Sequence, residues 1–257
     1  MPTSPQPSTT PSPTTPPPAA SPSPAPSSAA PSSPAQRSGT PLSSTERSTL
    51  TRKQDRGVAD RGELHAVLDA GLLCHLALVS GGSPLCVPTG YGRDGDTLYL
   101  HGSTGSGNVR TAARGVDICV TVTILDGIVY ARSLNNHTMN YRSAVVHGRA
   151  RAVTEDAERD RALQVISDRL APGSWDYARR PDAKELAGVA VLALDLTEAS
   201  VKVRGGDPAE QPADVDRDDV WAGVIDVRTV FGSPRAASYV PADLPAPPHV
   251  AERPAPR

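Results

Sequence analysis

The stretch that most restricts the fold consists of two strand-like runs joined by a polar connection. Ile128–Leu134 precedes the connection, and Tyr141–Val153 follows it. The second run alternates, which puts Arg142 on one predicted face with Ala144 and Val146. A cation on an apolar face needs a partner, which is either a carboxylate or a bound anion. The guanidinium fork suits phosphate oxygens, and pairing with an acidic side chain is the alternative.

The other predicted elements are short, and turn signals separate them. The predicted strands are Leu72–Val79, Pro84–Tyr91, Thr97–Gly102, Asp117–Leu125, Val189–Leu196 and Ala199–Arg204, and the predicted helices are Arg61–Ala70, Val109–Ala113 and Glu155–Leu170. Asp126 and Gly127 predict a hairpin turn. About seven or eight mostly antiparallel strands, with one long and a few short helices, indicate a mainly β barrel of the α+β type.

The predicted size of the barrel restricts where a ligand can bind. A barrel this small is filled by its own side chains, so a large planar ligand is expected outside it, at a seam between two subunits. We therefore expect a homodimer. Its contact would also cover apolar strand residues such as Ala199, Val201 and Val203.

The distribution of proline divides the chain into three parts. Of the 27 prolines, 14 fall within the first 41 residues, among Ser, Thr and Ala. Residues 1–46 and 234–257 have no apolar periodicity and are expected to be disordered, Pro-rich tails. Residues 47–233 are long enough for one domain with its own core.

Charge and cysteine content narrow the classes of partner. A net charge of −2 gives no indication of a nucleic-acid partner. No apolar run approaches the roughly 18 residues of a membrane helix. Cys74, Cys86 and Cys119 each lie within an apolar predicted strand and are expected to be buried thiols. Such thiols suit a cytoplasmic protein, and the cysteine spacing predicts no metal site.

Three longer runs carry a resemblance to a known family. They read SPLCVPTGYGRDGDTLYLHGSTGS, LDGIVYARSLNNHTMNYRSAVVHGRARAV and EASVKVRGG, followed by the shorter VWAGVI. Together they resemble the pyridoxamine 5′-phosphate oxidase-like family, most closely its flavin-nucleotide-binding branch. The resemblance implies a split β-barrel and a homodimer that binds FMN between its subunits.

The same resemblance implies a set of cofactor-binding residues. The strand around the flavin ring would supply Val87, Pro88 and Thr89, the following strand and loop would supply His101, Gly102, Ser103, Ser106 and Asn108, and the polar end would be contacted by Arg142 and Ser143. Many relatives carry a cation directly after the loop serine, where this chain has Gly107 and Asn108. The phosphate is therefore expected at Arg110, Arg142, Lys202 or Arg204.

The resemblance implies an FMN-dependent oxidoreductase that transfers hydride through flavin N5 to or from an unknown small molecule. No acid–base pair is evident in the sequence, and His101 and His137 are the candidates for a catalytic group. One alternative is a flavin-binding or sensor module without turnover. Another keeps the fold and binds the deazaflavin F420 or haem, with His101 or His137 as the axial haem ligand.

Overall fold

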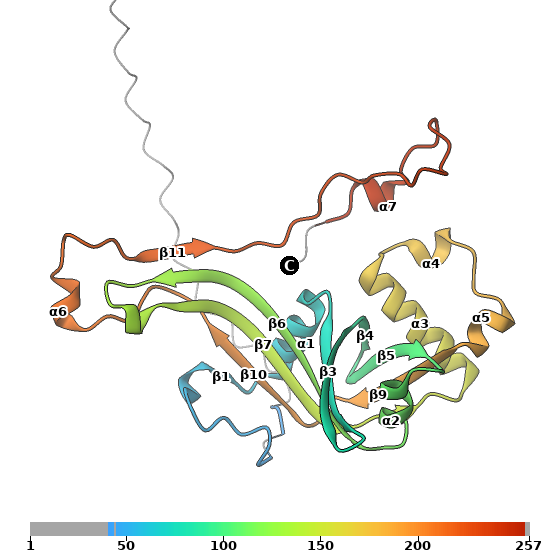
Figure 1. Cartoon of the computed structure of the whole chain (residues 1–257), viewed down its shortest axis with the longest axis horizontal. Coiled ribbons are helices and arrows are strands. Elements are labelled where there is room, and N and C mark those ends of the chain that lie inside the picture. The colour runs from blue at the N-terminus through green and yellow to red at the C-terminus, as the bar shows by residue number, and fades with distance from the viewer. Residues whose placement is uncertain (1–40, 44, 255–257) are drawn as a thin grey trace, which may run out of the picture. The chain divides into compact units, whose positions relative to one another are not determined.

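The computed structural model describes residues 41–43 and 45–254, which form two antiparallel sheets (Figure 1). The first sheet has the order β1-β10-β7-β6-β2-β3, with β11 added beside β6, and the second has the order β4-β5-β9-β8. The strands are β1 (Gly57–Val58), β2 (Cys74–Ser80), β3 (Ser83–Thr89), β4 (Tyr91–Asp94), β5 (Thr97–Ser103), β6 (Asp117–Tyr130), β7 (Thr138–Arg149), β8 (Arg151–Ala152), β9 (Val189–Asp195), β10 (Ala199–Arg204) and β11 (Gly223–Asp226). The expected mainly β class is confirmed, and the arrangement is that of a split β-barrel.

Helices pack against the two sheets and connect their strands. They are η1 (Gln54–Arg56), α1 (Arg61–Ala70), α2 (Gly107–Ala112), η2 (Leu134–Asn136), α3 (Asp156–Leu170), α4 (Ser174–Tyr177), α5 (Ala183–Ala187), α6 (Pro212–Val215) and α7 (Pro248–Ala251). Helix α1 occupies the residues predicted for it and buries Leu64, Val67 and Leu68 in the main core. Helix α3 packs against the second sheet, where Ile166 joins Tyr99 in a smaller cluster.

The hairpin turn predicted at Asp126 and Gly127 was wrong, because strand β6 runs through both residues. The strand continues through both residues to Tyr130, and its register with β7 shifts between Leu125 and Gly127, which marks a β-bulge. The Asp-Gly pair is held in this bulge because β7 and β11 pair with the two edges of β6 beyond it. The chain reverses instead at η2, where the Ala131 amide donates to Nδ1 of His137 at 2.9 Å.

Strand β7 confirms the alternation predicted for it. Ala144 and Val146 are fully buried, and a Cβ at Gly148 would lie 2.8 Å from Leu194 Cδ1. For β10 we expected apolar side chains that a second subunit would cover. This expectation was wrong, because Ala199 and Val201 are also buried in the core. Strand β10 pairs with both β7 and β1. Its buried apolar side chains face the inside of the barrel, and a second copy cannot contact them.

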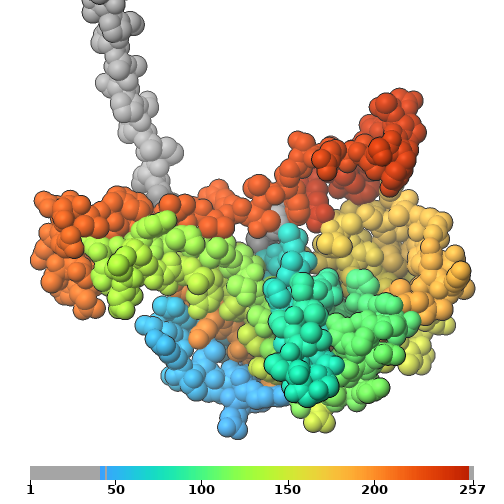
Figure 2. Space-filling model, viewed as in Figure 1, coloured from blue at the N-terminus to red at the C-terminus, as the bar shows by residue number. Residues whose placement is uncertain are grey.

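The contacts of the domain begin before the expected start at residue 47. The Leu42 amide donates to the Ala59 carbonyl at 2.7 Å, and the Thr45 hydroxyl donates to Glu198. At the other end, the His249 ring lies 5.0 Å from the Tyr177 ring, within the predicted C-terminal tail. Figure 2 shows this segment in red, next to the yellow region that includes α3 and α4. Residues 1–40, 44 and 255–257 of the predicted tails lie outside the described residues.

The exposure of each cysteine depends on the position of its strand in the sheet. Cys74 is buried as expected, whereas Cys119 is half-buried and Cys86 is exposed. The expectation fails for Cys86 because β3 is an edge strand whose alternate residues face outward. Within the described residues, no helix is long and apolar enough to cross a membrane, and no cluster of His, Cys, Asp and Glu could hold a metal ion.

Candidate cofactor site

A cavity lies at the split between the two sheets, and most of the predicted cofactor residues line it. We call it the split pocket; its volume is about 180 Å³. Among the described residues, β3 pairs with β2 alone, so its other edge faces β5 and α2 across this gap. The predicted residues that line the split pocket are Val87, Pro88, Thr89, His101, Gly102, Ser106 and Asn108.

The loop from β5 to α2 forms one wall of the split pocket. A Cβ at Gly102 would lie 2.6 Å from Val109 Cγ2, so glycine allows α2 to pack directly on β5. Ser103 shapes the loop and does not line the pocket: its carbonyl accepts from the Ser106 amide at 2.9 Å, and its hydroxyl accepts from the Gly105 amide at 3.2 Å. The remaining wall residues Leu76, Leu100, Val109 and Leu192 are apolar.

His101 is the titratable residue of the split pocket. Its Nδ1 atom is buried and has no hydrogen-bond partner within the described part of the chain. Burial lowers the pKa of His101 from its ordinary value of 6.5, so the imidazole is neutral at neutral pH. The same side chain also lines a second cavity of about 240 Å³ beside α4 and α5. A neutral imidazole at this position can donate through one nitrogen and accept through the other.

The four cations considered for the phosphate differ in their partners. Arg142 binds Asp126 through two hydrogen bonds of 2.8 and 3.0 Å, and this contact raises the pKa of Arg142. Arg204 is bound by Asn140 and by two carbonyls. The side chains of Arg110 and Lys202 have no hydrogen bond or ion pair to another described residue. Of these two, Arg110 lies in α2, whose first turn lines the split pocket.

Two predicted residues and one predicted catalytic candidate are placed away from the split pocket. Arg142 has the carboxylate partner that its position on an apolar face required, and it lines another cavity. Ser143 lies beside it on β7, opposite Thr123 and Lys202. His137 belongs to the turn at η2, where its Nδ1 atom accepts a main-chain hydrogen bond. A contact of these residues with a flavin stays a prediction.

The other cavity, of about 680 Å³, lies where β6 has no strand partner on one edge. Strand β2 pairs with β6 up to Thr121, and β11 pairs with it from Gly127 onward. Residues Val227–Val230, which we call the strap, cross the gap between them, and the Val227 amide donates to the Asp126 carbonyl at 3.0 Å. We call this cavity the strap pocket.

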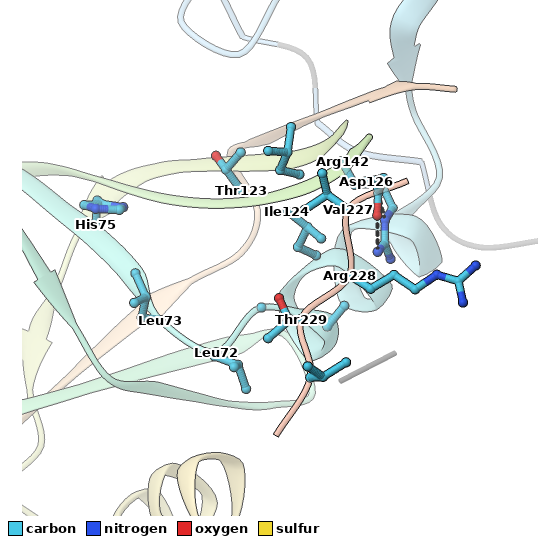
Figure 3. A pocket seen from close by; sticks show the side chains of 14 residues that line it. Leu72, Leu73, His75, Thr123, Ile124, Asp126, Arg142, Val227, Arg228 and Thr229 are labelled. Carbon is cyan, nitrogen blue, oxygen red and sulfur yellow. Dashed lines mark hydrogen bonds and ion pairs between the residues drawn. The ribbon is translucent and has the colours of Figure 1, made fainter. Parts of the chain in front are cut away.

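Figure 3 shows the strap pocket from close by. Leu73 and His75 lie on the β2 side of the strap pocket, and the strap residues Val227 and Thr229 lie on the other side (Figure 3). His75 is exposed, and none of the described residues gives its side chain a hydrogen bond, an ion pair or a ring contact. Sequence reasoning missed this residue: the run LLCHLALV was predicted only as a strand, and the alternation of His75 with Cys74 and Leu76 is the signal that could have identified an outward-facing histidine.

Comparisons with known proteins were made for the whole chain. A family model described as pyridoxamine 5′-phosphate oxidase matches residues 60–203. The chain is similar to the FAD and heme binding protein from Mycobacterium smegmatis, with 38% identity, a TM-score of 0.73, and coverage of 77% of this chain and 96% of that one. It is also similar to the flavocytochrome Anf3 from Azotobacter vinelandii, with 34% identity, a TM-score of 0.77, and coverage of 82% and 98%. A search of curated proteins gave no match.

Proposed function

The chain belongs to the pyridoxamine 5′-phosphate oxidase family, and we propose that it is a flavin-dependent oxidoreductase that binds its flavin at the split pocket. The observation that carries this proposal is the convergence of β3, β5 and α2 on one cavity, with seven of the predicted cofactor residues in its wall. The names of the two relatives, a FAD and heme binding protein and a flavocytochrome, also support it. When bound, a flavin exchanges a hydride at N5.

The residues of the split pocket have distinct roles in this proposal. The free edge of β3 offers main-chain donors and acceptors to the flavin ring, and the apolar wall around Leu76 and Leu192 excludes water from it. His101, held neutral by burial, offers a nitrogen to the flavin or to the substrate. Arg110 offers its charge to the phosphate, because it lies in α2, whose first turn lines the split pocket, whereas Arg142 and Arg204 are bound by protein groups.

A titration with flavin tests the assignment of Arg110. We expect Arg110→Ala to weaken FMN and FAD binding on the order of tenfold, the scale of one lost charge-assisted contact. Arg114→Ala is the matched control, because Arg114 is an exposed arginine just after α2 without a side-chain partner among the described residues. Equal affinity of both variants and the unchanged protein would show that the phosphate lies elsewhere.

The identity of the flavin is a separate question. The sequence resemblance implies FMN, and the name of the Mycobacterium smegmatis relative contains FAD. The two flavins share the isoalloxazine ring and the 5′-phosphate. Both therefore fit the same proposed contacts. Chromatography of the cofactor released from the purified protein distinguishes FMN, FAD and the deazaflavin F420. Reduction of the bound flavin by a nicotinamide donor, followed by reoxidation, would separate an enzyme from a sensor module.

We propose that the flavin is shared between two copies of the chain. The split pocket of about 180 Å³ is smaller than the roughly 300–1,000 Å³ typical of ligand sites, so one subunit does not enclose a flavin. Leu73, just before β2, and Val79 on β2 are exposed apolar side chains, which suits an apolar contact with a second copy. Light scattering combined with flavin absorbance should give a dimer with two flavins; a monomer with stoichiometric flavin would contradict it.

Haem binding is a second candidate function, and a specific residue favours it. The two relatives described above are named as a FAD and heme binding protein and as a flavocytochrome. His75 supplies an imidazole without a protein partner among the described residues, beside a large and mostly apolar cavity. A histidine of this kind is the usual proximal ligand of haem iron. Absorbance of the protein after addition of hemin tests whether the chain binds haem at all.

A further inference from the structure

The strap pocket has the size and the lining that a porphyrin requires. Its volume of about 680 Å³ lies within the roughly 300–1,000 Å³ of small-molecule sites. Most of its side chains are apolar, and they come from the segment before β2, from β6 and from the strap: Leu72, Leu73, Ile124, Leu125, Val227 and Val230. Apolar walls on two sides of a slot suit a flat, hydrophobic ring.

His75 is the side chain of the strap pocket that can bind a metal in this slot. It lies on the exposed side of β2, since its neighbours Cys74 and Leu76 are buried in the core. Within the described residues no donor or acceptor engages its ring, so a ring nitrogen is available as a ligand in the neutral imidazole. Figure 3 shows the ring on the wall that faces Thr123 and the strap.

The other five histidines are less suited to this role. His65 binds Asp96 at 2.8 Å, Nδ1 of His137 accepts a main-chain hydrogen bond, and the His249 ring packs on Tyr177. His147 lines a different cavity, beside Cys119 and Arg47. His101 lines the split pocket, which is the site proposed for the flavin. His75 is therefore preferred over His101 and His137, the two ligands considered from the sequence.

Charged groups lie in the wall of the strap pocket and on the strap. Arg142 and Asp126 form an ion pair in the wall of the strap pocket, and the strap adds Arg228. The side chain of Arg228 is 80% exposed, and its ion pair with Asp226 is 3.3 Å long. Such an exposed pair is weak, so Arg228 can reorient toward an anion at little cost.

We infer that the strap pocket is a haem site in which His75 is an axial ligand and Arg228 neutralises a propionate. This inference rests on the proposed haem binding and adds to it the site and its ligand. A haem bound there supplies one-electron chemistry at iron. The site lies next to the split pocket, because His75 is the cross-strand partner of Pro88, which lines that cavity.

The experiment compares hemin binding by the full chain and by two histidine variants. We expect His75→Ala to lose affinity on the order of 10–100-fold and to shift the Soret band, because the axial ligand is gone. His147→Ala is the matched control, since His147 lies on another outward strand position in a different cavity. Added imidazole should restore the Soret band of His75→Ala toward that of the unchanged protein.

A second pair of variants tests the pocket without changing a ligand. Leu73→Trp fills the strap pocket from an exposed position, and we expect weaker hemin binding. Leu134→Trp, at an exposed position outside the pocket, is its control and should bind as the unchanged protein does. Flavin absorbance and the melting temperature are recorded for each variant, which separates a folding defect from a lost site.

The outcomes distinguish the inference from the proposals beneath it. If the unchanged protein binds no hemin, both haem binding and this site are wrong. The flavin titration then still tests whether the split pocket binds a flavin. If hemin binds and His75→Ala keeps the same affinity and spectrum, the site alone is wrong. A loss in His75→Ala with imidazole rescue, together with an unaffected His147→Ala, supports the site.

Discussion

The split pocket and the strap pocket share strand β2 but are assembled in different ways. The walls of the split pocket come almost entirely from consecutive elements between Leu76 and Val109, with Leu192 added from β9. The strap pocket combines the end of α1 and the start of β2 with β6, Arg142 and the strap at Val227–Val230. A site built from neighbouring elements leaves a recognisable motif in the sequence. A site built from distant segments does not.

The two pockets also differ in their electrostatics. The split pocket has a neutral histidine and no ion pair among its lining residues. The strap pocket has the Arg142–Asp126 pair in its wall and Arg228 on its strap. Changes at one pocket should therefore leave the other intact, which gives the comparison a direct test.

The largest effect is expected from Gly102→Val. The new side chain would overlap Val109, because even a Cβ there would lie 2.6 Å from Val109 Cγ2. We expect α2 to be displaced, at a cost of roughly 1–3 kcal/mol in the free energy of unfolding, together with a loss of flavin affinity. Chemical denaturation and flavin titration measure the two effects.

Gly107→Ala is the control for that variant, since no atom lies within 4 Å of a Cβ at Gly107. It should change neither stability nor flavin binding to a comparable extent. Hemin binding should be kept in both variants. If Gly102→Val lost hemin and flavin together, the two pockets would not be independent.

A smaller effect is expected from Asp126→Ala, which affects the strap pocket. The substitution leaves the Arg142 guanidinium half-buried without its carboxylate. Because both side chains remain about one-third exposed, solvent screens the loss, and we expect about 1 kcal/mol of destabilisation. Asp219→Ala breaks a more exposed pair with Arg217 and should cost less. Equal costs in thermal melts would show that the Arg142 pair contributes no more than a surface pair.

A pH-dependent effect is expected from His101. Its pKa is lowered in the folded chain, so below pH 6.5 the unfolded chain binds a proton that the folded chain resists. The free energy of unfolding should therefore fall as the pH drops from 6.5 toward the folded pKa, and His101→Gln should remove this part of the loss. Glu185 and Glu198, whose pKa values are lowered to about 2, are ionised in the folded chain near pH 6.5 and do not contribute to the change there. Parallel pH profiles of both proteins would contradict the assignment.

The smallest effect, without a change in stability, is expected in thiol labelling. Burial raises the pKa of the Cys74 thiol to about 12, so Cys74 should not react in the folded protein. Cys86 is exposed on β3 beside the split pocket and should react first. Mass spectrometry after brief alkylation identifies the labelled residue. Slower labelling of Cys86 at higher protein concentration would support a second copy over this face.

The sequence alone determined most of the local elements, and the family resemblance named residues that line the split pocket. The helical spacing of Leu64, Val67 and Leu68 and the alternation around Ala144 and Val146 correctly predicted α1 and the inward face of β7. These signals depend on residues a few positions apart, which is why they can be read from a single chain. The same holds for the split pocket, whose motif residues lie on adjacent elements.

Only the tertiary structure decided the strap pocket, the bulge and the partner of Arg142. Asp126 and Gly127 have the local preferences of a hairpin turn, but pairing of β6 with β7 and β11 holds them in a continuous strand. The same pairing brings Asp126 to Arg142 and carries the strap across the gap beside His75. Contacts between residues about a hundred positions apart depend on which strand edges remain free after the core has formed. Local sequence does not encode that choice.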